Sequence, residues 1–238
     1  MLVVGLTGGI ATGKSTVSKR LQAKNIPVID ADVLAREVVQ PGTKGLARIV
    51  KAFGKDVLLP DGSLDRKNLG TIIFNDESKR RILNGIVHPA VRRAMLWGVI
   101  RCWTRGEKIC VLDVPLLIEG PLWKWVAKVV VVYCAEDVQL RRLMERDNST
   151  EEDATSRLKS QLPISEKRKY ADEVVDNSGS LEDLEHGVDA LIQKLDYAAG
   201  WTWRLSWLFP PFGILSAIWA LGRRAVRRSW RTTRTHVD

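Results

Sequence analysis

The residues from Gly8 to Ser15 have the types and spacing needed to bind a polyphosphate. They read Gly8-Gly9-Ile10-Ala11-Thr12-Gly13-Lys14-Ser15, which gives the pattern G-x-x-x-x-G-K-S, and Thr16 follows. Glycines let backbone N–H groups surround phosphate oxygens, the lysine neutralises the β- and γ-phosphates, and the serine hydroxyl is a ligand for Mg²⁺. The pattern predicts a nucleoside triphosphate site, but it does not specify a reaction.

The segments on either side of this loop are the elements that must position it. Residues 1–7 are mostly apolar and predict a buried strand rather than a cleavable signal, and residues 15–21 predict the start of a helix. A helix N-terminus adds unpaired N–H donors and a favourable dipole for an anion. Strand, loop and helix in this order support a phosphate site over the alternative, a chance match in a glycine-rich turn.

Further apolar segments predict the other strands of one sheet. Strands are expected at 28–29, 108–113 and 128–134, with a last strand and turn at 171–179. Because they alternate with helical segments, they predict right-handed crossovers and a parallel sheet covered on both faces. The expected class is therefore α/β, with five parallel strands flanked by helices. Ligands of such sheets bind at the carboxyl ends of strands, where the sequence places Asp30, Asp32 and Asp113.

Two long regions between the strands are expected to be helical. In residues 33–105, Asp65 is predicted to cap a helix, Pro89 to lie in the first turn of a later helix, and Gly106 to end it. The other region, 136–165, is charged, and such a run is most often a solvated face. Its arginines are Arg141, Arg142, Arg146 and Arg157.

Composition and charge limit the function classes. The 238 residues, of which 27% are charged, suffice for one good core. The net charge is +9, but six Arg and one Asp lie between 223 and 238, so a tail carries most of the excess and a specific nucleic-acid partner is not favoured. Cys102, Cys110 and Cys134 share no metal-ligand spacing and are predicted to be ordinary core or strand thiols in a reducing compartment.

Three features narrow the phosphate site to a kinase. The chain has no Asn-Lys-x-Asp motif, which argues against a GTPase, and its Arg-rich helical region lies where small-molecule kinases carry a lid. Asp32 follows the second strand, where a carboxylate can orient an acceptor hydroxyl and take its proton.

An ordered set of short motifs resembles the dephospho-CoA kinase family. The motifs are residues 6–15, Ile29-Asp30-Ala31-Asp32, His88-Pro89, Asp113-Val114-Pro115-Leu116-Leu117-Ile118-Glu119, Arg142…Arg146-Asp147, Gln161 and Ala171-Asp172…Asn177-Ser178-Gly179. Each later motif is weak alone, but the set is specific and covers residues 1 to about 195. The resemblance implies a P-loop kinase domain at 1–196, with an acceptor-binding insertion at 33–105 and a lid at 137–170.

The resemblance also implies a reaction and its participants. The family transfers the γ-phosphate of ATP, with Mg²⁺, to the ribose 3′-hydroxyl of dephospho-CoA in the last step of coenzyme A synthesis. By resemblance the catalytic residues are Asp32 as base, Lys14 and Arg146, and Ser15 is the metal ligand. Besides the loop and Thr16, the ATP-binding residues by resemblance are Arg142, Asn177 and Gly179. Those for the acceptor are Asp32, His88, Asp113, Leu116 and Leu117.

Several of these residues also have ordinary structural alternatives. Asp32 could be a helix N-cap, and Asp113 could be a strand-end cap rather than an acid near Mg²⁺ or the acceptor. Asn177 could be a turn residue in the left-handed region instead of a neighbour of adenine. His88 is expected to hold the helical region in place rather than to take part in the chemistry. Arg157 is a weaker lid candidate than Arg146.

The tail from 197 to 238 differs in composition from the rest. It holds five of the nine tryptophans, and residues 207–221 contain no charge. Pro210-Pro211 interrupts any helix there, and six arginines follow. The pattern favours membrane association through 200–222, on the cytosolic side of an intracellular membrane, over docking on protein or disorder. Without the tail, the kinase is expected to be cytoplasmic. By resemblance, such a tail indicates a eukaryotic source.

Besides a basic nucleic-acid binder that would act through residues 223–238, two alternatives to this function stay open at the level of sequence. One is a kinase for a nucleoside or nucleotide, which shares the loop and lid. The other is a membrane-bound scaffold with a degenerate kinase domain, which would have no need of Lys14, Ser15, Asp32 and Arg146.

Overall fold

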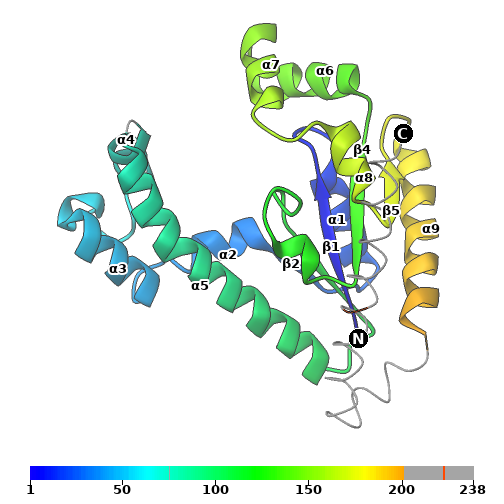
Figure 1. The fold of residues 1–238 in the computed structure, drawn as a ribbon, viewed down its shortest axis with the longest axis horizontal. Helices are drawn as coiled ribbons and strands as arrows, with labels where there is room; N and C mark the ends of the chain where they lie inside the picture. Colours follow the sequence, from blue (N-terminus) through cyan, green and yellow to red (C-terminus); the bar gives the residue numbers. More distant parts are fainter. Residues whose placement is uncertain (75, 201–221, 223–238) are drawn as a thin grey trace. The chain divides into compact units, whose positions relative to one another are not determined.

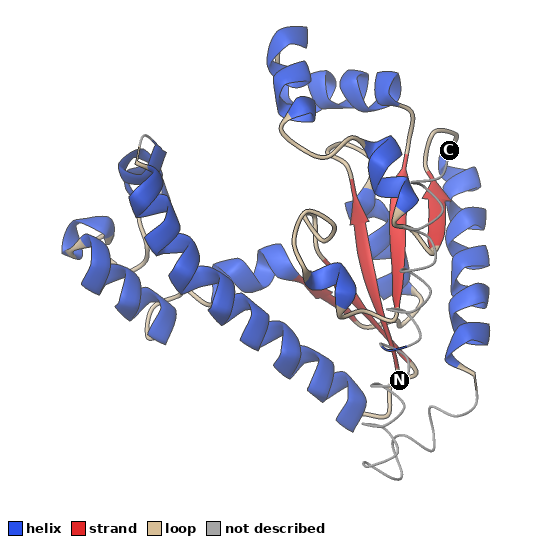
Figure 2. Cartoon of the chain, viewed as in Figure 1, coloured by secondary structure: helices blue, strands red, loops and turns tan. Residues whose placement is uncertain are grey.

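A computed structural model describes residues 1–74, 76–200 and 222 of the chain (Figure 1). The described residues form two compact units. One contains Met1–Val28 and the described residues from Arg101 onward, and the other is Ile29–Ile100. The first unit holds the phosphate loop and most of the sheet, and the second is largely helical (Figure 2).

The sheet has five strands, as the sequence predicts. They are β1 (Leu2–Gly8), β2 (Val28–Asp30), β3 (Ile109–Asp113), β4 (Lys128–Tyr133) and β5 (Glu173–Asp176), in the order β2-β3-β1-β4-β5. β1 pairs in parallel with β3 and β4, and β4 pairs in parallel with β5. In this register Leu6 lies beside Asp113 and Gly8 lies beside Val132. The carboxyl ends of these strands therefore meet at the edge where the phosphate loop begins.

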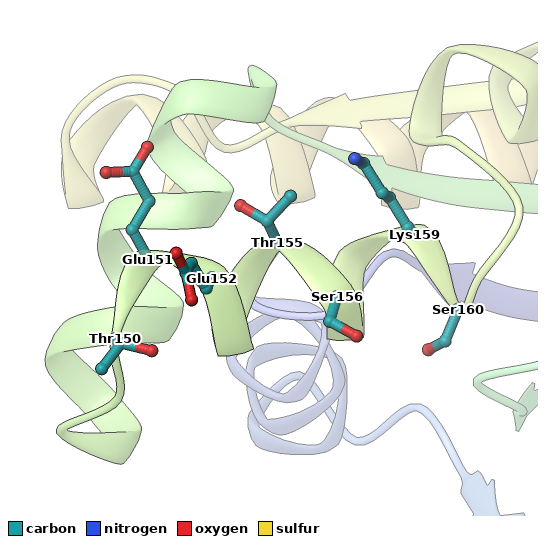
Figure 3. A pocket seen from close by; sticks show the side chains of 7 residues that line it. All are labelled: Thr150, Glu151, Glu152, Thr155, Ser156, Lys159 and Ser160. Carbon is teal, nitrogen blue, oxygen red and sulfur yellow. The ribbon is translucent and has the colours of Figure 1, made fainter.

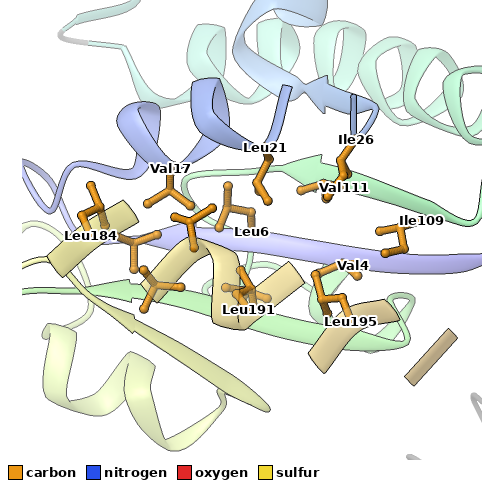
Figure 4. Packing of buried hydrophobic residues seen from close by; sticks show 14 residues of the cluster. Val4, Leu6, Val17, Leu21, Ile26, Ile109, Val111, Leu184, Leu191 and Leu195 are labelled. Carbon is orange, nitrogen blue, oxygen red and sulfur yellow. The ribbon is translucent and has the colours of Figure 1, made fainter. Parts of the chain in front are cut away.

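Two helices cover one face of this sheet. Helix α1 (Lys14–Ala23) and helix α9 (Leu181–Ala199) pack against each other, and α9 also contacts β1, β3 and β5. Their apolar side chains interdigitate with those of the strands (Figure 4). The buried cluster is Val4, Leu6, Val17, Leu21, Ile26, Ile109, Val111, Val130, Val132, Val175, Leu184, Val188, Leu191 and Leu195. Removing this apolar surface from water is the main stabilising contribution to the unit.

The opposite face is covered by the segment between β3 and β4. Leu117 and Val126 in this segment lie against Gly5 of β1, and a Cβ added to Gly5 would be 2.6 Å from the side chain of Leu117. Successive side chains of a strand point to opposite faces of the sheet, so Val129 and Val131 of β4 face one side and Val130 and Val132 face the other. All four side chains are buried. Burial of all four confirms that the central strands are covered on both faces.

The second unit consists mainly of helices. They are α2 (Ala31–Glu37), α3 (Lys44–Phe53), η1 (Lys55–Val57), α4 (Arg66–Phe74) and most of α5 (Glu77–Thr104). A separate core of Val39, Ile49, Val57 and Leu69 holds them together. Asp65 accepts a hydrogen bond from the backbone N–H of Asn68 at 2.9 Å, so its predicted capping role is confirmed.

The prediction that Pro89 begins a helix is wrong. Pro89 lies inside α5, a single helix of 28 residues that ends near Gly106, whose φ is +72°. Proline removes one helical hydrogen bond, but apolar side chains on both sides of it are packed. Leu83, Ile86 and Val87 contact the core of the second unit, and Val91 and Met95 are buried. Tertiary packing therefore outweighs the local preference of proline for a helix start.

The Arg-rich region forms three helices, α6 (Glu136–Asp147), α7 (Glu151–Lys159) and α8 (Ile164–Lys169). A further 3₁₀ turn, η2, spans Leu122–Lys124. Nearly all of the apolar tail, 201–221, and the arginine-rich end, 223–238, lie outside the described residues. Within the described part of the chain, no helix is both long and apolar enough to cross a membrane.

Candidate active site

The phosphate loop connects the last residue of the central strand to the first residue of a helix. Gly8 ends β1 and Lys14 begins α1, and Gly13 between them has a φ of +83°. Gly13 is the N-cap of α1 and provides no side-chain cap, and the first turn contains no acidic residue. The N–H of Thr16 donates to the carbonyl of Gly13 at 2.9 Å, so the N–H groups of Lys14 and Ser15 at the start of the turn are the ones that can bind an anion. The helix dipole favours the charge of that anion.

Lys14 is paired with a buried carboxylate. Its Nζ forms an ion pair with Oδ1 of Asp113, the last residue of β3, and that carboxylate is almost wholly buried. The strand register brings Asp113 to the phosphate loop, because it lies beside Leu6 and the loop begins two residues later. Asp113 therefore does more than cap its strand, because it holds the ammonium group that is predicted to bind phosphates.

Three buried donors from the C-terminal half of the chain bind carbonyl groups of the loop. Lys167 Nζ lies 3.3 Å from Gly8 O, Gln139 Nε2 lies 2.8 Å from Ile10 O, and Asn177 Nδ2 lies 2.8 Å from Thr12 O. These donors are only 0%, 3% and 6% exposed, respectively. Lys167 also forms an ion pair with Glu119 at 2.8 Å, which compensates the burial of its charge.

Sequence reasoning missed Lys167 and Gln139. Lys167 lies in the run Lys167-Arg168-Lys169, which predicts a solvated face. Gln139 is buried on the same side of α6 as Leu143, four residues later, and that spacing was an available signal. Asn177 was predicted, but its alternative role as a left-handed turn residue is wrong, because its φ is not positive. A contact between Asn177 and adenine stays a prediction.

The lid arginines form contacts within the first unit. Arg142 donates to the carbonyl of Asn177 at 2.9 Å, close to the phosphate loop. Arg146 makes two hydrogen bonds to Asp147, at 2.8 and 3.0 Å, and Arg157 also bonds to Asp147. The pKa of Asp147 is lowered to about 2, mainly by its hydrogen bonds to Arg146 and to a smaller extent by its contact with Arg157. Contact of Arg146 or Arg157 with ATP stays a prediction.

Both arms of the expected lid are attached to the loop at Ile10. Gln139 of α6 donates to its carbonyl, and Gln161, which follows α7, accepts from its N–H at 3.1 Å. A cavity of about 120 Å³ lies beside this contact, and Gly9, Ile10 and Ile164 contribute to its walls. The bases of α6 and α7 are therefore anchored to the part of the loop that is predicted to meet phosphate.

A larger hollow of about 1100 Å³ lies on α7 itself (Figure 3). Thr155 and Lys159 project from one side of the helix, and Ser156 and Ser160 project from the other. All its lining residues belong to α7 or its immediate ends, so it does not enclose a ligand.

Asp30 and Asp32 lie in the second unit and have different positions. Asp30 ends β2 and is the N-cap of α2, accepting hydrogen bonds from Asp32 N at 2.8 Å and Val33 N at 3.2 Å. The alternative of Asp32 as the N-cap is therefore wrong, and Asp30 fulfils that role. Asp32 is exposed in the first turn of α2, so its carboxylate is accessible to a substrate. Its role as base stays a prediction.

The other predicted acceptor residues differ in exposure. Leu117 is fully buried against Gly5, whereas Leu116 is 52% exposed, so Leu116 is the one of this pair that a substrate can touch. His88 is exposed on α5, and its role stays a prediction. Gly179 precedes the capping box of α9, and a Cβ there would lie 2.7 Å from Asp183.

The part of the chain that the structure covers has three buried cysteines and no large cluster of metal-ligating side chains. Its residues include no group of three or more His, Cys, Asp or Glu side chains able to hold a metal ion. Cys102, Cys110 and Cys134 are free and buried, as predicted for core thiols. Burial raises the pKa of the Cys110 and Cys134 thiols, which disfavours the reactive thiolate.

A parallel sheet with this loop at the carboxyl end of its central strand, followed by a helix that begins at the loop lysine, defines a P-loop kinase fold. The family model for dephospho-CoA kinase matches residues 2–183. The dephospho-CoA kinase of Arabidopsis thaliana is 46% identical over 206 residues, which is 86% of this chain and 89% of that protein. That of Geobacillus kaustophilus is 50% identical over 195 residues, which is 82% of this chain and 97% of that protein.

The solved structure of a dephospho-CoA kinase from Campylobacter jejuni has a TM-score of 0.66 and 31% identity, and the match covers 82% of this chain and 98% of that one. The chain therefore belongs to the dephospho-CoA kinase family, and it is a kinase of coenzyme A biosynthesis that uses ATP. The expected fold and function are confirmed at this level.

Proposed function

We propose that the phosphate loop and Lys14 bind the β- and γ-phosphates of ATP while Asp32 accepts the proton of the ribose 3′-hydroxyl of dephospho-CoA. The observation that carries this proposal is the pairing of Lys14 with Asp113 at the mouth of the loop. Asp113 holds the ammonium group of Lys14 beside the phosphate loop, so that group needs to move little to exchange the carboxylate for phosphate oxygens. The choice of dephospho-CoA as the acceptor is supported by membership of the dephospho-CoA kinase family.

The proposed reaction is a direct displacement. The 3′-oxygen forms a bond to the γ-phosphorus, the bond from that phosphorus to the β,γ-bridging oxygen breaks, and ADP leaves. The 3′-hydroxyl proton passes to an Asp32 carboxylate oxygen. The loop N–H groups, Lys14 and a lid arginine, with Arg146 the first candidate, stabilise the charge on the transferred group.

Magnesium fits one position in this arrangement. Mg²⁺ in kinases is held by few protein ligands together with substrate phosphates and water. Ser15 is exposed in the first turn of α1, so its hydroxyl is suited to that role. When bound, the ion supplies positive charge to the β- and γ-phosphates.

The test is a coupled ADP-release assay on the full chain with dephospho-CoA, with AMP, CMP and adenosine as competing acceptors. We expect turnover with dephospho-CoA and none with the others. Preference for a nucleoside or nucleotide would replace the acceptor assignment, and ATP binding without transfer to any acceptor would favour a scaffold.

For the tail we propose membrane association through residues 200–222, on the cytosolic side of an intracellular membrane. The uncharged stretch at 207–221, its flanking tryptophans and the six following arginines support this. Co-sedimentation with vesicles containing anionic phospholipid is expected for the full chain and not for a variant lacking 201–238. Equal sedimentation of the two proteins would exclude the tail as the anchor.

A further inference from the structure

The contacts of the phosphate loop with Lys167, Gln139 and Asn177 follow a regular pattern. The three carbonyl groups that they bind belong to Gly8, Ile10 and Thr12, which are alternate residues of the loop. The donors come from α8, from α6 and from the residue after β5, so they meet only in the folded chain.

The geometry of the peptide group gives this pattern a consequence. In a planar trans peptide, the carbonyl of one residue and the N–H of the next point in opposite directions. Holding the carbonyls of Gly8, Ile10 and Thr12 therefore directs the N–H groups of Gly9, Ala11 and Gly13 away from the three donors. A loop of this type binds phosphate oxygens through backbone N–H groups, and these three N–H groups belong to the loop.

Lys167 is the most informative of the three donors. It is fully buried, and within the described residues its Nζ forms an ion pair with Glu119 at 2.8 Å and a hydrogen bond to Gly8 O at 3.3 Å. A buried ion pair is seldom more stabilising than a well-packed apolar pair of the same size, so packing alone does not explain a lysine here. Its contact with the first carbonyl of the loop gives the ammonium group a specific use.

We propose that Lys167, together with Gln139 and Asn177, is a positioning residue of the ATP-phosphate site. These side chains hold alternate peptides of the loop so that its N–H groups are oriented before ATP arrives. Preorganised donors stabilise charge without a cost of reorientation during the reaction. This inference rests on the proposed binding of ATP phosphates by the loop.

The experiment separates positioning of the loop from simple neutralisation of Glu119. The variants are Lys167→Met, which keeps the length of the side chain, and the double variant Lys167→Met with Glu119→Gln, which also removes the unpaired carboxylate. Lys169→Met is the matched control, because Lys169 is on the same helix, exposed and paired with Glu166. Melting temperature, KM for ATP, kcat, and dissociation constants for ATP and for adenosine are measured on each full-length protein.

We expect Lys167→Met to lower the melting temperature and to weaken ATP binding about tenfold or more, as for the loss of one charge-assisted hydrogen bond. The double variant is expected to regain most of the melting temperature but not the ATP affinity. Adenosine, which has no phosphate, should bind all variants equally, and Lys169→Met should match the unaltered chain.

Wild-type ATP affinity in the double variant would overturn the proposal. If neither Lys167 variant folds, Gln139→Met is expected to show the same selective loss for ATP over adenosine, and unchanged ATP affinity in that folded variant would equally overturn it. Failure of the proposed function has a different result, because the unaltered chain would then not bind ATP more tightly than adenosine.

Discussion

Replacing Gly13 by alanine tests the geometry of the phosphate loop. Gly13 has a φ of +83°, and a Cβ added there would lie 2.1 Å from Asn177 Nδ2. No such approach is tolerated, so either Asn177 must move or the loop must. Gly42 is a matched control, because its φ is also +83° but a Cβ there meets nothing within 4 Å.

The two variants share one energetic contribution and differ in another. An L-residue in the left-handed region costs about 1–2 kcal/mol, and both alanine variants incur this cost. In Gly13→Ala, displacement of Asn177 also breaks its 2.8 Å hydrogen bond to Thr12 and leaves a buried amide unpaired, which costs about 1–3 kcal/mol more. We therefore expect Gly13→Ala to be destabilised by about 2–5 kcal/mol in total.

Urea unfolding of both variants measures this difference, and calorimetry measures their affinity for ATP. Gly13→Ala should also lose at least tenfold in ATP affinity, about 1.4 kcal/mol, whereas Gly42→Ala should bind ATP as the unaltered chain does. Equal destabilisation of the two variants with unchanged ATP affinity would refute the reasoning. It would mean that the loop or Asn177 can move aside for the added Cβ with no loss of stability or of ATP binding.

Three further predictions concern Asp32, Lys14 and Asp147. Asp32→Asn should lower kcat by about two to four decades with an unchanged ATP dissociation constant, and near-normal turnover would remove Asp32 as the base. Lys14→Met should lower kcat, and it should also lower the free energy of unfolding by about 3 kcal/mol, because the buried carboxylate of Asp113 loses its ion pair with Lys14. Adding Asp113→Asn should restore stability but not turnover. Asp147 should titrate with a midpoint at about pH 2 by NMR, because Arg146 lowers its pKa from 3.8. Since the folded pKa is the lower one, this contact stabilises above about pH 4 and is lost as pH falls through 2, and an ordinary midpoint would disprove the contact in solution.

Much of the fold could be predicted from the sequence because the signals are local. Runs of β-branched residues such as Val129–Val132 form strands wherever they can be buried, and all five strands were predicted within a few residues. The chemistry of the loop was equally predictable, since the spacing of Gly8, Gly13 and Lys14 determines which groups can surround a phosphate. The one clear error in the helices, at Pro89, occurred where packing on both sides of the residue outweighs its local preference.

The partners of the site residues could not be predicted in the same way. A buried cation in a charged run has the same sequence appearance as a solvated one, so Lys167 gave no signal before the fold brought it to Gly8. The contact of Asp113 with Lys14 depends on strand register, which joins residues 99 positions apart.

The amino-acid sequence by itself determined the strands and the phosphate loop, because each depends on neighbours along the chain. It also indicated the class of reaction, through an ordered set of short motifs that spans residues 1 to about 195. Only the tertiary structure decided which side chains hold the loop in place. The three donors that bind its carbonyl groups lie at least 129 residues away in sequence, and no local pattern specifies which of many polar side chains will be buried there.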